Sequence, residues 1–135
     1  IQIYNELFEP SDVLDKPYMI VCLNAIVAES DEEAEYLAST LAQVFIGIAR
    51  GRMQPVQPPT NDLQALLTPR EFEMAKQRFN DSLIGSEETV KEKLEAFIEE
   101  YGEIDELMGI SYIYDQEKQF ESFTRLQNII EKLNQ

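Results

Sequence analysis

The chain has 135 residues, of which 44% are apolar, and its 26 acidic and 11 basic side chains give a net charge of −15. That length allows one domain with a substantial core, and the composition excludes a disordered chain. The charge argues against nucleic acid and anionic membranes as partners, because both recruit cations. The sequence has no histidine and one cysteine, Cys22, which excludes an internal disulfide, a histidine-based triad and a histidine-ligated metal site. We expect no metal, and we expect Cys22 to be a buried structural thiol.

The ends and apolar runs of the sequence bear on location. No apolar run approaches the roughly 20 residues that cross a bilayer. Residues 1–10 are acidic and amphipathic, unlike the basic and then apolar pattern of a signal peptide. We therefore expect a cytoplasmic protein, and because Ile1 is not methionine we expect the sequence to lack its start.

The first strand follows a short amphipathic helix over residues 1–8 and is predicted over Tyr18–Ala28. Its nearly continuous apolarity is typical of a parallel strand that is covered on both faces. Asn24 is its only strongly polar residue. A buried amide needs partners, so Asn24 either bonds its neighbours or faces the mouth of a barrel.

A helix is predicted after this strand, beginning at a capping box in which Ser30 accepts a backbone N–H and Glu33 reaches back. It ends near residues 47–51, where Arg50 and Arg52 give the densest positive charge in the chain. Such charges are favoured at a helix end, which is the simpler interpretation. They also suit the phosphate or carboxylate of a ligand, so both arginines are candidate binding residues.

Residues 53–80 form a long connection before the next strand. The connection is rich in proline at first and then contains a helix that begins at Thr68, with Pro69 in the first turn and Glu71 placed for a capping box. Long connections in such folds are often lids or binding elements. We therefore predict that 53–80 is a lid-like excursion.

The second strand is short, Ser82–Ile84, and is followed by a turn at Gly85 and by Ser86 as the cap of the next helix. Free N–H groups and the helix dipole favour an anion there, which makes Gly85 and Ser86 candidates for binding a cofactor's phosphate. Glu87 and Glu88 occupy the same field, so plain capping is the stronger interpretation.

The last strand is predicted over Glu106–Tyr114 and the last helix over Gln116–Leu133. Asp115 lies between them, at the C-terminal end of a strand, which is the catalytic rim of a βα barrel. An aspartate there also caps the following helix, and we favour the cap. No residue is assigned a catalytic role.

The strand, turn and helix repeat three times, which predicts an α/β fold of three parallel βα units within a single domain, residues 1–135. The short second strand is expected between two flanking strands, whose outer edges are left unpaired. Three units cannot close a barrel that needs eight. The sequence therefore predicts a partial (β/α)8 barrel.

Together these segments resemble the C-terminal part of the bacterial luciferase-like flavin-dependent monooxygenase family. The resemblance rests on the order and spacing of seven segments: Phe8–Ser11, Leu14–Pro17, Met19–Asn24, Ala28–Ala34, Leu83–Val90, Glu106–Met108 and Ser111–Asp115. It implies a TIM barrel to which this chain contributes the last three βα units. Residues 53–80 would then match the mobile lid over the active site.

The resemblance also implies a function. Members of the family use FMN or a related flavin to oxidise an organic substrate, and most flavin contacts come from the five βα units that precede this part. We therefore expect the chain alone to be inactive and not to bind flavin, and we expect its partner to be the missing N-terminal barrel part or a second copy. The alternative is a non-catalytic barrel remnant that acts as a homodimer or as a subunit of a split barrel. A third possibility is a small acidic binding module unrelated to flavin.

Overall fold

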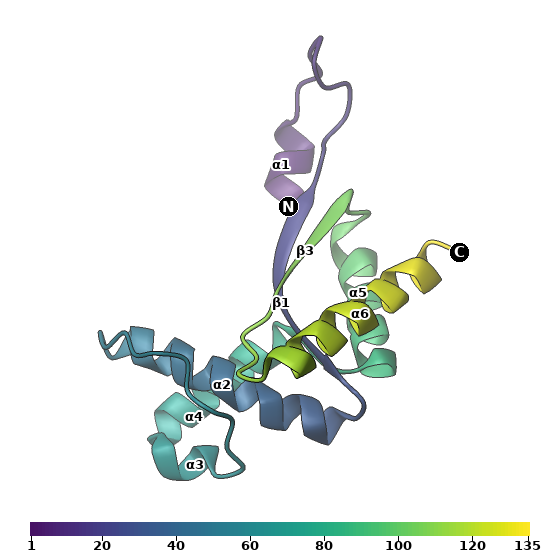
Figure 1. Cartoon of the computed structure of the whole chain (residues 1–135). Helices are drawn as coiled ribbons and strands as arrows, with labels where there is room; N and C mark the ends of the chain where they lie inside the picture. The colour runs from purple at the N-terminus through teal and green to yellow at the C-terminus, as the bar shows by residue number, and fades with distance from the viewer.

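The structure, a computed structural model, describes all residues, 1–135, and has six helices and three strands (Figure 1). In chain order these are α1 Gln2–Leu7, β1 Ile20–Ala28, α2 Asp31–Ala49, α3 Leu63–Leu66, α4 Pro69–Asn80, β2 Leu83–Ser86, α5 Glu87–Tyr101, β3 Glu106–Ile110 and α6 Gln116–Leu133. All predicted strands and helices are present, with shifted ends, and the short α3 is an addition. None of the helices combines the length and the apolarity needed to span a membrane.

The three strands form one parallel sheet in the order β2-β1-β3. β2 pairs with β1 from Ala25 to Ala28, and β3 pairs with it from Ile20 to Asn24. The predicted parallel βα units are confirmed, but the expectation that the short strand lies between the other two is wrong. β1 has nine residues and β2 only four, so β1 alone is long enough to pair with both other strands.

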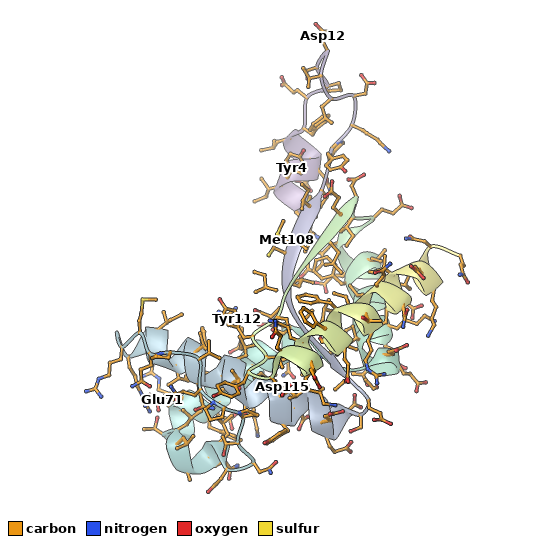
Figure 2. All side chains as sticks on the ribbon, in the orientation of Figure 1. Tyr4, Asp12, Glu71, Met108, Tyr112 and Asp115 are labelled. Atoms are coloured by element: carbon orange, nitrogen blue, oxygen red, sulfur yellow. The ribbon has the colours of Figure 1, made fainter.

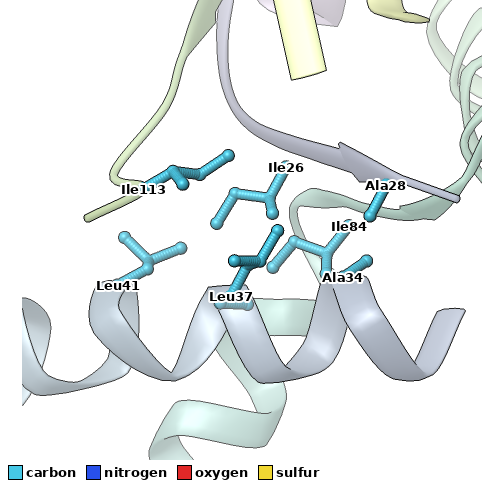
Figure 3. Close-up of a cluster of buried hydrophobic side chains, with 8 residues drawn as sticks. Ile26, Ala28, Ala34, Leu37, Leu41, Ile84 and Ile113 are labelled. Carbon is cyan, nitrogen blue, oxygen red and sulfur yellow. The ribbon is translucent and has the colours of Figure 1, made fainter. Parts of the chain in front are cut away.

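Helices cover both faces of the C-terminal half of this sheet. Ile26 and Ala28 pack against α2 and Ile113 (Figure 3). Ala25 and Val27 pack instead against α5 and α6. Because successive side chains of a strand point to opposite faces, α2 lies on one face and the pair α5 and α6 on the other. The predicted cover on both faces is confirmed for this half of β1.

The N-terminal half of the sheet is covered on one face only. Leu23 and Leu107 pack on the side of α5 and α6, whereas Ile20 and Met108 on the opposite side are 52% and 56% exposed. Cys22 pairs with Met108 in the register and is also exposed, so the prediction of a buried thiol is wrong. The reason is that α2 reaches only the C-terminal half of β1. We call the exposed side chains the bare face: Ile20, Cys22, Met108 and Ile110.

The N-terminal arm, α1 with the loop after it, projects from the rest of the molecule (Figure 1). No residue of α1 is buried, and its apolar Ile3 and Leu7 are 73% and 75% exposed. The Tyr18 N–H donates to the Tyr4 hydroxyl at 3.3 Å, which ties the helix to the chain that leads into β1. Like the bare face, the arm has apolar side chains without a cover.

β3 ends at Ile110 rather than at the predicted Tyr114. Beyond that point α6 lies at the edge of β1 in place of the strand. There the Val27 N–H donates to the Ser122 hydroxyl at 2.9 Å. Ile113 meanwhile turns into the core beneath α2. A side chain therefore satisfies the backbone group that a longer β3 would have bonded.

Replacing Ser122 with alanine tests this role. Ser122 is 1% exposed, and its loss leaves a buried N–H unsatisfied, so we expect unfolding to require about 1–3 kcal/mol less free energy. Urea denaturation measures the change. Thr124→Ala removes an exposed hydroxyl from the same helix and serves as the control. An equal loss in both variants would contradict the role of Ser122.

Candidate functional site

The turns that follow β1 and β2 are joined by Asp31, in the first turn of α2. Its carboxylate accepts the Ser86 N–H at 2.7 Å and the Thr89 hydroxyl at 3.0 Å. The Ser86 N–H, and after it the Thr89 hydroxyl, lower the pKa of the Asp31 carboxyl. Asp31 is thus a tertiary cap for the start of α5.

This cap bears on the candidate phosphate site. Helix starts bind anions through free N–H groups, but Ser86 gives its N–H to Asp31. Its hydroxyl accepts the Thr89 N–H at 3.4 Å, as predicted for a cap. A Cβ at Gly85 would lie 2.9 Å from an Asp31 carboxylate oxygen, so the turn has no spare room. The chain's own carboxylate therefore takes the position that a phosphate would need beside Gly85 and Ser86.

Asp115 is also a cap. Its side chain accepts the Lys118 N–H at 2.9 Å, in agreement with the interpretation favoured from the sequence. The Lys118 ammonium lies 2.8 Å from the Glu33 carboxylate, which ties the start of α6 to α2. Ser30 accepts the Glu33 N–H at 3.2 Å, as predicted, but Glu33 accepts the Glu29 N–H at 3.2 Å instead of that of Ser30, so the predicted capping box is only half formed. The polar groups at the strand ends therefore hold helices together.

The candidate Arg50 is not a free cation. Its Nε and Nη2 each lie 2.6 Å from a different carboxylate oxygen of Glu71. Arg50, and after it the Thr68 N–H, lower the pKa of Glu71 to about 2. Thr68 and Glu71 also form the predicted capping box of α4. Arg50 thus links the end of α2 to the excursion.

The excursion, 53–80, lies along α2. The Thr40 hydroxyl donates to the Gln57 carbonyl at 2.9 Å, and the Gln43 amide donates to the Pro58 carbonyl at 3.0 Å. The predicted lid, which contains α3 and α4, is therefore docked on α2 (Figure 1).

Acid should weaken this docking. The Glu71 pKa of about 2 in the folded chain is below its ordinary 4.5, so its stabilising effect is complete above pH 4.5 and is lost as pH falls through about 2. We expect the melting temperature of the wild type to fall between pH 5 and 2 by more than that of Glu71→Gln, because only the wild type has this carboxylate to protonate. Thermal melts across that range measure the difference. Glu73→Gln, which removes an exposed carboxylate from the same helix, should follow the wild type.

Lys93 is a half-buried cation whose ammonium is fully used. It donates to the carbonyls of Ser82 at 3.0 Å, Ile84 at 3.3 Å and Phe79 at 3.4 Å. Burial lowers its pKa. This group anchors β2 to α5 and leaves no donor for a ligand.

A cavity of about 220 Å³ lies where the end of α2, the start of the excursion and the chain after β3 meet. Its lining residues are Gln43, Val44, Gly47, Ile48, Arg52, Met53, Gln54, Pro55, Val56, Gln57 and Tyr112. Of the sequence candidates, the structure places only Arg52 in this cavity. Tyr112, which comes from the far end of the chain, was not a candidate.

Two further polar groups lie near the bare face. Asn24 is half-buried, at the junction between the bare face and the part of β1 that α2 covers, and its neighbour across the sheet is Ile110. The Ser111 hydroxyl, just after β3, is buried without a hydrogen-bond partner. Such groups are normally bonded, so Ser111 indicates a missing partner.

Comparisons with known proteins identify relatives. No protein-family model matches the chain. A luciferase-like monooxygenase from Escherichia coli K12 is 31% identical over 133 residues, which are 98% of this chain and 39% of that protein. YddN, an uncharacterized protein of Bacillus subtilis, is 34% identical over 133 residues, with the same shares of the two chains.

A solved structure shows the same fold within a larger protein. The crystal structure of apo-MsnO8 matches with a TM-score of 0.73 and 21% identity, over 96% of this chain and 40% of that one. The chain thus spans about two fifths of the length of the relatives it matches, and its parallel βα sheet is a partial barrel. Over nearly its whole length the chain is thus similar to about two fifths of a luciferase-like monooxygenase.

Proposed function

We propose that the chain is part of a flavin-dependent oxidoreductase of the luciferase-like family, with a cytoplasmic location. The observation that carries the proposal is the 31% identity to a luciferase-like monooxygenase over 98% of the chain. By this proposal the cofactor is FMN or a related flavin. The flavin would supply the redox and oxygen chemistry, and the protein would supply shape and the exclusion of water.

Two of the candidate positions for a flavin phosphate are occupied by carboxylates of the chain itself. The start of α5 is filled by Asp31, and Arg50 is held by Glu71. We therefore propose that the rest of the barrel provides the flavin site. In this proposal the chain contributes a wall of the barrel and its helical cover.

The bare face supports the proposal that another part of the protein covers the sheet. Exposed apolar side chains that gather on one surface mark an interaction site, and Figure 2 shows Met108 at the side of the sheet with no helix over it. The relatives have about three fifths of their length outside the matched part. We propose that this remainder, within the same protein or on a second chain, covers the bare face.

Flavin absorbance and mass in solution test the proposal. We expect excess FMN to keep its free spectrum when mixed with the chain alone. We expect a shifted spectrum and a larger complex when the part of the E. coli relative that this chain does not match is also added. A shifted spectrum with the chain alone would contradict the proposal that the rest of the barrel provides the flavin site. A dimer that neither binds FMN nor responds to the added part would favour the non-catalytic remnant.

A further inference from the structure

We propose that the cavity beside Arg52 is a binding site for a compact carboxylate with an apolar body. The cavity is formed by segments that are far apart in the sequence, since Tyr112 follows β3 whereas Arg52 and Val56 belong to the start of the excursion. This inference does not depend on the proposed flavin-dependent function. The carboxylate site can be absent while the proposed function holds, and the proposed function can be wrong while the site exists.

Charge is the first argument. Although the chain has 26 acidic residues, none lines this cavity, and Arg52 is the only charged side chain that does. The larger cavity between α2 and α4 is different, because Glu32 and Glu35 line it together with Lys76. Because no carboxylate lines this cavity, the Arg52 guanidinium can attract an anion there, against the overall repulsion from a chain of net charge −15.

The Arg52 guanidinium also indicates which kind of anion would bind, a carboxylate or a phosphate. A guanidinium presents a planar fork of donors that matches a carboxylate in a bidentate pair, as Arg50 shows with Glu71 in this chain. One cation neutralises a single negative charge. A phosphate dianion would keep a net negative charge inside a strongly acidic protein, which favours the carboxylate.

The body of the ligand follows from the walls and the volume. Val44, Ile48 and Val56 provide apolar surface, and Tyr112 provides an aromatic ring, whereas Met53 is 92% exposed and adds little. The volume of about 220 Å³ is below the range of about 300–1,000 Å³ that is typical of larger ligands. A single ring or a short branched chain therefore fits, and a flavin does not.

Binding of benzoate to the full chain, followed by protein NMR shifts, tests the site. We expect saturable shifts at residues of the cavity, and a dissociation constant about tenfold or more larger for Arg52→Gln, because a hydrogen bond to a charged group is lost. Arg70→Gln removes an exposed arginine charge outside the cavity and should leave benzoate binding unchanged. Benzamide, which has the same ring without the charge, should bind at least tenfold more weakly than benzoate.

A second variant distinguishes binding of benzoate in the cavity from a simple attraction to the charge of Arg52. Val56→Trp keeps Arg52 and fills the apolar space, so we expect it to abolish benzoate binding. Equal weakening by Arg52→Gln and Arg70→Gln would overturn the site. So would unchanged binding in Val56→Trp, or tighter binding of inorganic phosphate than of benzoate.

Discussion

Replacing Ile26 with alanine is expected to lower the free energy of unfolding by about 2–5 kcal/mol. Ile26 is 0% exposed and joins β1 to the inner face of α2 and to Ile113 (Figure 3). Few side chains in the chain are both as large and as deeply buried. Native domains have only about 5–15 kcal/mol in total, so this single substitution should remove a large share of the stability.

Urea denaturation followed by circular dichroism measures this loss. Ile48→Ala is the matched control, because Ile48 is 59% exposed near the end of α2 and its truncation should cost about 0.5 kcal/mol or less. Similar midpoints for Ile26→Ala and the wild type would mean that this core does not hold the sheet to α2.

Replacing Met108 with glutamate is expected to weaken association with the rest of a luciferase-like barrel by about tenfold or more. Met108 is 56% exposed in the bare face, so the isolated variant should fold as the wild type does. Covering the bare face would then bury an unpaired carboxylate, which costs more than the 1.4 kcal/mol that corresponds to a tenfold change.

Sedimentation of the chain mixed with the unmatched part of the E. coli relative gives the association constant. Met74→Glu is the matched control, since Met74 is 37% exposed on α4, outside the bare face. If the two variants associate equally well with that part, the bare face is not the contact surface.

Local signals in the sequence were sufficient for the helices and their caps. Ser30, Thr68, Ser86 and Asp115 all cap the helices for which they were predicted. A cap requires only a side chain and a backbone N–H a few residues away, so its pattern is present in a short stretch of sequence. The three parallel strands were equally readable from their apolar runs.

Groups that depend on distant neighbours were not predictable in this way. Nothing near Asp31 indicates that it accepts the Ser86 N–H, and nothing near Ser122 indicates that it serves Val27. The apolar neighbours of Cys22 suggested burial, yet burial depends on how far α2 extends along the sheet. The strand order likewise follows from relative strand lengths, which repeat patterns do not reveal.

The candidate site also contains features that local sequence predicts and features that depend on distant contacts. From the sequence, Arg50 and Arg52 were equally good candidates for binding an anionic ligand. Only the structure shows that Arg50 is paired with Glu71, whereas Arg52 lines a cavity. Tyr112 reaches that cavity from a distance of many residues along the chain. The resemblance to luciferase-like proteins needed no such contacts, because it rests on the order of whole segments.

The reactivity of Cys22 tests most directly whether this chain is an incomplete barrel. Cys22 is the only cysteine and lies in the bare face, so an aromatic disulfide reagent reports on this surface alone. We expect rapid labelling in the isolated chain, and slow labelling once the unmatched part of the E. coli relative is added in excess. Labelling that stays equally fast in the mixture, or that is already slow in the dilute isolated chain, would contradict the account.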